Sequence, residues 1–397
     1  MTDTLDLWDL EDESTPTDQQ EDLSDLDGSS DWTNGVALWS TDWTSETVIR
    51  QLQKGNINLN PNWQRRGAWR DDRQSKFIES LILGLPVPQI VLAETPDQRG
   101  RFIVIDGKQR LITLLRFGGG DGEQFSPLAL TGLTDREDLN SKTLSDLEAD
   151  PDHQEDVSSF ENQSMRTVII KNWTNEKYLY SVFLRINTGS VQLSPQELRQ
   201  ALSPGDFSNF VDSFSAASKP VQKMLGLKEP DFRMRDAEIV LRFIAYKLYA
   251  PNYGGVLKQF LDDTTKSLNA DWKKKQKLIE QVAGSLEDAI NFTFEIFEKS
   301  AMRKWNGEKF ERPINRAVFD IMAYYFSNSN VREAAKGKGA EIVSRFKSLC
   351  TDDRDFLTSL ESTTKSIEAN SKRFATWGAA LEDILGIKLA IPKFKDL

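Results

Sequence analysis

A short apolar strand that runs directly into an amphipathic helix limits the folds open to this chain. The strand covers residues 101–105, and the helix continues to Phe117 from the junction Asp106-Gly107-Lys108-Gln109-Arg110. A glycine lets the backbone turn tightly at such a junction, and the first turn of the helix presents N–H groups that have no partner within the helix. These features predict an α/β unit with a seat for an anion such as phosphate at the start of the helix.

The spacing of apolar residues changes near residue 200. Before it, the pattern predicts strands at residues 36–39, 89–93, 101–105 and 165–170, with helices between them and a polar, partly ordered insertion at 121–163. After it, a capping box at Ser194–Glu197 opens a run of amphipathic stretches that includes residues 237–249, 274–299, 314–326, 340–349 and 366–385. We therefore predict an α+β chain, with a small α/β domain over 36–200 and an all-helical domain over 201–397.

The negative charge of the chain is concentrated at its start. Residues 1–45 hold thirteen Asp or Glu and no Lys or Arg, so the rest carries about +2 of the total of −11. Such a segment buries too little apolar surface to fold alone, which predicts a disordered acidic tail over residues 1–35. The tail is either a solubilising leader or a tether that docks on a partner through Trp8 and Trp32.

The content of cysteine and histidine excludes several classes of site. The chain has one cysteine, Cys350, and one histidine, His153, which rules out an internal disulfide, a Cys/His zinc site and a nuclease metal site with two histidines. Cys350 follows a helical apolar pattern and is predicted to be a core residue, whereas His153 lies in an acidic stretch and is predicted to be solvated. No membrane span or secretory signal is visible, so we expect a cytoplasmic protein.

Tryptophans and arginines alternate over residues 60–70. Trp63 and Trp69 stand among Arg65, Arg66 and Arg70, a combination that can stack on a base and hold phosphates. The same composition also arises where the stems of arginines cover tryptophan rings. Basic runs in the helical half, at residues 273–277, 303–304 and 336–338, leave a similar choice between a nucleic-acid contact and a solvated helix face.

Several motifs in order make the chain resemble the N-terminal domain family of GmrSD-type restriction endonucleases, which has a ParB/sulfiredoxin-like fold. The matching segments are Pro61 with Trp63-Gln64-Arg65 and Trp69, Ser80–Pro86, Asp106–Arg110, and Phe183–Asn187 with Leu193-Ser194. Two positions depart from the family pattern. Lys108 replaces a glutamine, which adds a cation for phosphate, and Trp63 replaces the more usual Tyr or Phe.

The resemblance implies a site for a nucleoside triphosphate and Mg²⁺. Its implied catalytic residues are Asp106, Gln109 and Arg110. The implied nucleotide-binding residues are Gln64, Arg65, Gly107, Lys108, Asn187 and Thr188. The implied DNA contacts are Trp63, Arg66, Trp69 and Arg70. Asp106 and Glu79 are the candidate metal ligands, although Glu79 also suits a solvated helix position.

The function implied by the resemblance is an NTP-binding and NTP-hydrolysing sensor or regulator of a restriction-type antiphage system that acts on DNA. The longer family members cut DNA with an HNH nuclease domain, which requires a histidine base; the only histidine, His153, lies outside the helical half. Cutting would then need a separate nuclease or defence subunit, and oligomers remain open. Two alternatives are a non-catalytic DNA-binding or partner-docking module and a metal-dependent DNA phosphodiesterase.

Overall fold

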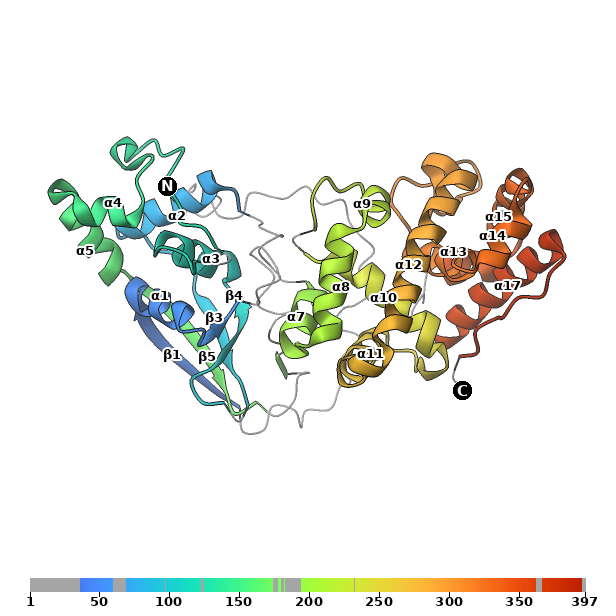
Figure 1. Cartoon of the computed structure of the whole chain (residues 1–397), viewed down its shortest axis with the longest axis horizontal. Helices are drawn as coiled ribbons and strands as arrows, with labels where there is room; N and C mark the ends of the chain where they lie inside the picture. The colour runs from blue at the N-terminus through green and yellow to red at the C-terminus, as the bar shows by residue number, and fades with distance from the viewer. Residues whose placement is uncertain are drawn as a thin grey trace. The chain divides into compact units, whose positions relative to one another are not determined.

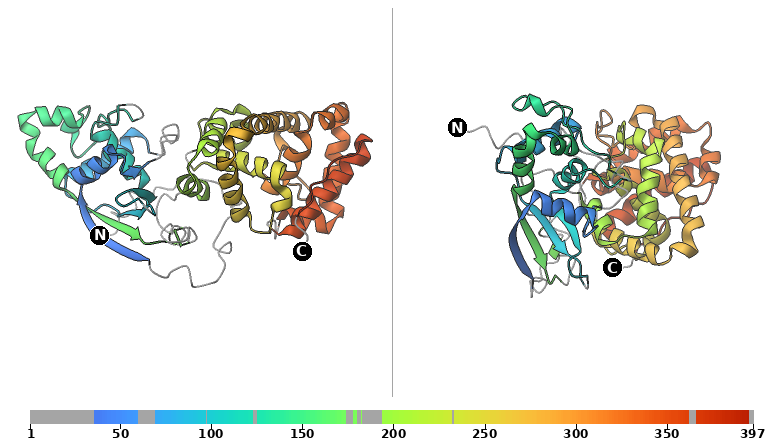
Figure 2. Two further views of the ribbon diagram at one scale, coloured as in Figure 1. Left: turned by 60° about the horizontal axis from the view of Figure 1, so that its bottom comes forward. Right: turned by 60° about the vertical axis from the view of Figure 1, so that its left-hand side comes forward.

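The chain folds into two units that follow each other in sequence. A computed structural model of the protein describes residues 36–59, 69–96, 98–122, 125–173, 178–179, 182, 194–231, 233–361 and 366–394. The first unit ends at Leu202, and a helical unit begins at Ser203 and continues to the C-terminus. Both are drawn as ribbons in Figure 1 and, from two other sides, in Figure 2. The predicted tail at residues 1–35 lies outside the described residues.

The first unit is built on a mixed sheet of five strands in the order β1-β5-β3-β4-β2. The strands are β1 (Ala37–Thr44), β2 (Ile57–Asn58), β3 (Ile90–Glu94), β4 (Phe102–Asp106) and β5 (Ser164–Lys171). β1 pairs antiparallel with β5 and β3 with β4, whereas β3–β5 and β2–β4 are parallel. All four predicted strands form. β1 is longer than predicted because its polar half pairs with β5 over the full length of both strands.

A bulge interrupts the sheet directly before the junction that the sequence singles out. Val91 pairs with Asp106, but the next residue, Leu92, pairs with Val104. Ile105 is therefore an extra residue in β4. A bulge bends its strand and re-aims the side chains that follow, so it sets the direction in which β4 delivers Asp106.

Helices cover the sheet and are bound to it by apolar residues. They are α1 (Ser45–Gln53), α2 (Asp71–Ile82), α3 (Lys108–Phe117), α5 (Gln154–Asn162) and α7 (Pro195–Leu202). The first four pack on one another and gather beside the sheet (Figure 1). Leu198 of α7 packs in an apolar core that also contains Ile105 and Val91. Phe102 and Val104 of the same strand are buried outside this core. Alternation along β4 thus buries apolar side chains on both faces of the sheet.

The predicted insertion is better ordered than its polar composition suggests. Residues 125–163 form α4 (Leu144–Ala149), α5 and two 3-10 turns, η4 (Glu137–Leu139) and η5 (Pro151–His153). Widely spaced apolar residues are buried: Leu128, Leu130, Leu133, Leu139, Leu147 and Phe160. The polar stretch thus contains regular helical elements, because a few well-spaced leucines anchor an otherwise acidic sequence.

The helical unit confirms the amphipathic stretches read from the sequence. Its helices are α8 (Asp206–Ala217), α9 (Lys219–Leu225), α10 (Arg235–Tyr249), α11 (Leu257–Ala270), α12 (Trp272–Phe297), α13 (Arg316–Phe326), α14 (Ser329–Ala335), α15 (Gly339–Asp352), α16 (Arg354–Glu361) and α17 (Ile367–Leu385), with the short turns η6 (Ala250–Asn252) and η7 (Glu298–Ser300). They share one apolar core, which contains Cys350 as predicted. No described helix combines the length and apolar character needed to cross a bilayer.

Candidate functional site

The junction between β4 and α3 depends on a glycine. Gly107 caps α3 with a φ of 94°, and no side chain caps the helix. A Cβ at this position would lie 3.2 Å from Nη2 of Arg110 and 3.3 Å from Cγ1 of Ile90. Both the left-handed backbone and the close approach of Arg110 therefore favour glycine, and the first N–H groups of α3 remain without a side-chain cap.

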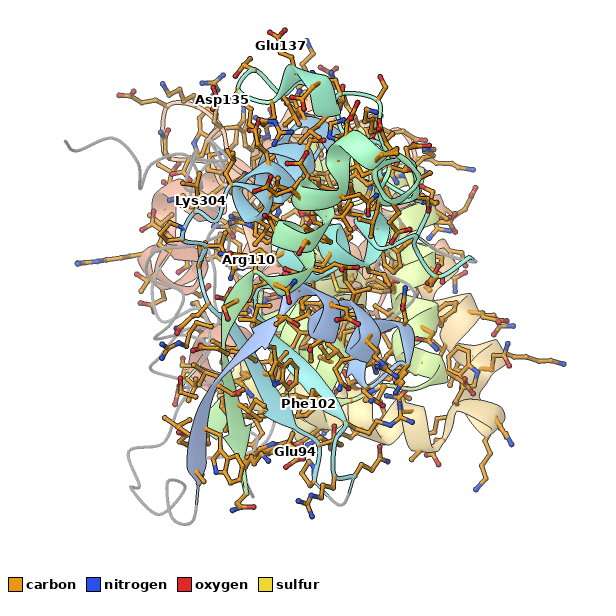
Figure 3. All side chains as sticks on the ribbon, turned by 90° about the vertical axis from the view of Figure 1, so that its left-hand side faces the viewer. Glu94, Phe102, Arg110, Asp135, Glu137 and Lys304 are labelled. Carbon is orange, nitrogen blue, oxygen red and sulfur yellow. The ribbon has the colours of Figure 1, made fainter. Side chains whose placement is uncertain are left out.

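Asp106 and Arg110 face each other across this glycine. Nη2 of Arg110 lies 3.0 Å from Oδ2 of Asp106 and also donates to the carbonyl oxygen of Gln89 at 3.0 Å. Their side chains are only 8% and 11% exposed for Arg110 and Asp106. Figure 3 labels Arg110 within the body of the first unit. Nε of Arg110 is buried and has no hydrogen-bond partner among the described residues, so the guanidinium retains one unused donor.

Lys108 makes a second buried ion pair at the same junction. Its Nζ lies 3.2 Å from Oε1 of Glu197, and both side chains are 4% exposed. The other oxygen of Glu197 accepts the N–H of Ser194 at 2.7 Å, and Ser194 Oγ accepts the N–H of Glu197, which is the predicted capping box of α7. The charge of Lys108, expected to serve phosphate, is thus neutralised by Glu197.

The charges of the junction balance within the protein. Asp106 and Glu197 match Arg110 and Lys108, so these residues have no net charge to offer a triphosphate. A surplus of positive charge would have to come from elsewhere. Arg65 and Arg66 are the predicted source and lie outside the described residues.

Gln109 connects the junction to the tryptophan-rich stretch. Its Oε1 accepts the N–H of Trp69 at 3.4 Å. The ring of Trp69 is buried, stands 5.9 Å from the ring of Phe77 and has the guanidinium of Arg73 4.8 Å from its centroid. At Trp69, therefore, the arrangement is an arginine covering a tryptophan rather than a ring exposed for a base. Arg70, in contrast, extends into solvent with its side chain 87% exposed.

Residues described directly after two predicted segments contact the turn at residues 106–110. Trp63, Gln64, Arg65 and Arg66, and likewise Asn187 and Thr188, lie outside the described residues. Trp69 is the first described residue after the former group, and it donates its N–H to Gln109. Ser194 is the first described residue after the latter group, and it reaches Lys108 through Glu197. The turn therefore contacts two described stretches that are far apart in the sequence.

Glu79, the second candidate metal ligand, is bound elsewhere. Its Oε1 accepts the backbone N–H of Arg136 at 3.0 Å, and the residue is buried. The alternative of a solvated helix position is wrong, because Glu79 fastens α2 to the insertion. No contact among the described residues joins it to Asp106, so its role as a metal ligand stays a prediction.

The sequence reading missed a second cluster of polar residues in the insertion. Asp138, His153 and Asp156 bring their possible ligand atoms within 4.8 Å of one another. Arg136 lies 2.6 Å from Asp138 and 2.7 Å from Asp156, and Nδ1 of His153 lies 2.8 Å from Asp156. His153 is thus paired and only 12% exposed, which corrects the expectation that it is solvated. Because Arg136 already binds both carboxylates, we regard the cluster as a clamp that holds the insertion together.

Comparison with known families assigns the region that contains the junction. Residues 47–203 match the model described as the N-terminal domain of GmrSD restriction endonuclease. The match begins in α1 and ends just after α7, so it spans the sheet, the junction and the insertion. Comparison with the curated proteins found no match. Comparison with the solved structures found none either.

Proposed function

Since residues 47–203 carry the N-terminal domain of the GmrSD restriction endonuclease family, we propose that this protein is the nucleotide-binding component of a restriction-type defence system. In this proposal the turn at residues 106–110 binds a nucleoside triphosphate with Mg²⁺, hydrolyses it and regulates action on DNA. The domain would have the ParB/sulfiredoxin-like fold, with which the mixed sheet is compatible. Cutting would belong to a separate nuclease subunit.

One observation carries the proposal. The turn is contacted by the residues described directly after both predicted nucleotide-binding segments: Trp69 donates to Gln109, and Glu197, which accepts from Ser194, pairs with Lys108. Described residues more than 120 positions apart in the sequence thus meet at one turn. Convergence of this kind is what a pocket for a charged small molecule requires.

The junction also has features that suit a phosphate. Gly107 lets the guanidinium of Arg110 lie close to the backbone, and α3, with ten residues, has no side-chain cap on the N–H groups at its start. The unused Nε donor of Arg110 is a buried polar atom that a phosphate oxygen could satisfy. A single carboxylate, Asp106, suits Mg²⁺, which is commonly held by one or two carboxylates together with phosphate oxygens.

Binding would redistribute the present ion pair. Arg110 would hold phosphate oxygens, and Asp106 would hold the ion directly or through water. When bound, Mg²⁺ neutralises charge that develops on the transferred phosphoryl group. Gln109 is the most exposed of the charged and amide residues at the turn, and in this proposal it would orient a water molecule.

The test compares Asp106→Asn with wild type in phosphate release from the four common NTPs, with and without modified and unmodified DNA. We choose asparagine because it keeps the size of the side chain beside Arg110. We expect turnover to fall by about 100-fold or more, since one electrostatic contact to the reacting group contributes roughly that much. Asp72→Asn is the matched control, because Asp72 is half-exposed and pairs only with exposed Arg70. Equal turnover in wild type and Asp106→Asn would reject the enzymatic part.

The internal balance of charge favours a second candidate, in which the turn is a ligand switch without catalysis. Asp106, Lys108, Arg110 and Glu197 are all paired within the protein, and hydrolysis would need Asp106 and Arg110 to separate. NTP binding measured by calorimetry, with no phosphate release even when DNA is present, would identify this candidate. Binding that is lost in Asp106→Asn would still place the ligand at the turn.

A further inference from the structure

A basic cavity lies in the helical unit, outside the residues that match the family. It measures about 570 Å³ and is formed by α9, the chain that follows it and α12. Lysines dominate its lining, which consists of Lys219, Lys223, Lys228, Gln222, Asn291, Pro220 and Leu227. α9 and α12 pack against each other (Figure 1). We call these residues the lysine cavity.

The three lysines of the cavity carry uncompensated charge. The lining contains no carboxylate, and within the described part of the chain none of the three forms an ion pair. Lys219 donates to Oε1 of Gln222 at 3.2 Å, and Nζ of Lys223 lies 4.3 Å from the ring centroid of Phe294. The nearby Glu287 accepts a hydrogen bond from Ser218 and does not line the cavity.

Several other lysines of the chain have a carboxylate partner. Lys108, Lys142, Lys258, Lys275 and Lys304 each pair with a carboxylate. Three unpaired lysines around one concave surface raise the local positive potential and concentrate anions there. The amides of Gln222 and Asn291 add donors for oxygen atoms.

We propose that the lysine cavity binds phosphates of the DNA backbone. The choice of DNA rests on the proposed function, whereas the choice of phosphate rests on the charges of the cavity alone. Lysine ammonium groups act as mobile point charges without the planar geometry that would select one anion. The cavity would therefore raise affinity for any duplex and position it, while leaving sequence or modification to be recognised elsewhere.

The test removes the charges of the cavity and follows the salt dependence of DNA binding. The variant is Lys219→Gln/Lys223→Gln/Lys228→Gln in the full chain, with a fluorescent duplex titrated between about 50 and about 200 mM salt. We expect about 10-fold weaker binding at low salt. We also expect the slope of log K against log salt to become shallower by about 2 to 3, because each phosphate contact contributes about 0.9.

A matched control separates a site from general charge. Lys299→Gln/Lys309→Gln/Lys393→Gln removes the same number of charges from exposed positions of the same unit, outside both the cavity and the basic runs. An equal loss of slope in both variants, or no loss in either, would overturn the proposal. Thermal unfolding checks that the cavity variant folds, which its three exposed lysines lead us to expect.

Further measurements distinguish DNA binding at the lysine cavity from nucleotide binding at the turn. Asp106→Asn should keep the slope of wild type, and the cavity variant should keep NTP binding. In one possible outcome, pyrophosphate or ATP competes with the duplex at constant ionic strength, while the cavity variant binds the duplex as tightly as wild type does. This combination would assign the cavity to small phosphates and overturn the DNA proposal. Absence of any DNA binding by wild type would also overturn it, yet would leave NTP binding at the turn intact.

Discussion

Two groups of buried charges, one in each unit, look alike in burial but differ in their surroundings. At the junction of the first unit, Asp106–Arg110 and Lys108–Glu197 form matched pairs. In the helical unit, Asp320 of α13 forms ion pairs with Arg242 of α10 and with Arg373 of α17, and all three side chains are fully buried. Nη2 of Arg242 lies 2.6 Å from Asp320, and that of Arg373 lies 3.1 Å away.

The difference lies in what surrounds the charges. The helical group has two cations and one anion and is enclosed by hydrogen bonds between helix interiors, with Asn370 accepting from Tyr246 and Arg373. Although burial opposes it, the charge of Asp320 raises the pKa of Arg242 above its ordinary value, and burial raises the pKa of Tyr246 to about 12. The junction group instead stands at a strand end and two helix starts. Buried charge alone therefore does not indicate a ligand site, and the proposal of a site at the junction rests on its position at the ends of elements.

The largest effect is expected from Asp320→Ala. The change removes the carboxylate that two buried arginines share, and breaking a buried pair in this way costs about 3 to 5 kcal/mol. We expect the transition that melts the helical unit to lose at least about 4 kcal/mol in urea unfolding followed by circular dichroism. Asp355→Ala is the control, because Asp355 is 85% exposed. A loss below about 1 kcal/mol would show that this group does not hold α10, α13 and α17 together.

The second prediction concerns the Lys108–Glu197 pair. Lys108→Met removes the cation that pairs with the buried carboxylate of Glu197, so we expect a loss of about 3 kcal/mol from the free energy of unfolding of the first unit. Lys108→Met/Glu197→Gln should recover about half of it, since glutamine still completes the capping box with Ser194. The double-mutant cycle is measured by urea unfolding. If the double variant recovers no stability, the charge of Glu197 itself is needed. The junction would then resemble the buried group of the helical unit, in which the charges are needed for stability.

The same two groups indicate what the sequence can and cannot predict. The strand, the glycine turn, α3 and the capping box at Ser194 were predictable, because each depends on neighbours within a few residues. The partners of the charges were not. Glu197 is 89 positions from Lys108, and Asp320 is 78 positions from Arg242. Lys108 has the local sequence of a phosphate ligand, but only the tertiary fold brings it into an ion pair with Glu197 of α7.

Other differences have the same cause. The polar half of β1 becomes a strand because β5 offers it backbone partners, and the acidic insertion becomes ordered because isolated leucines find a core. At Trp69 the guanidinium of Arg73 covers the ring, while a contact of Trp69 with DNA stays a prediction. Patterns of local periodicity carry no information on such partners.

The smallest effect is expected at the clamp of the insertion, where charges are only partly buried. Hydrogen bonding from Arg136, despite the opposing effect of burial and with help from His153, lowers the pKa of Asp156 from 3.8 to about 2. A carboxyl group with a lowered pKa stabilises the fold above its ordinary pKa, and this contribution is lost as the pH falls from about 4 towards 2. With the side chain of Asp156 16% exposed, we expect the loss to be about 1 to 2 kcal/mol.

Arg136→Gln should remove this sensitivity to acid, because it removes the main cause of the shift while the backbone N–H of residue 136 still reaches Glu79. Stability measured from pH 5 to pH 2 should therefore fall less steeply in this variant than in wild type. Asp135→Asn is the control, since Asp135 is exposed on the insertion (Figure 3). Parallel curves for wild type and Arg136→Gln would contradict the prediction. If the loss of stability here is smaller than at Asp320 or Lys108, the contributions of the three groups to stability follow the order of their burial. Burial then accounts for stability, and a functional role has to be argued from where each group lies in the fold.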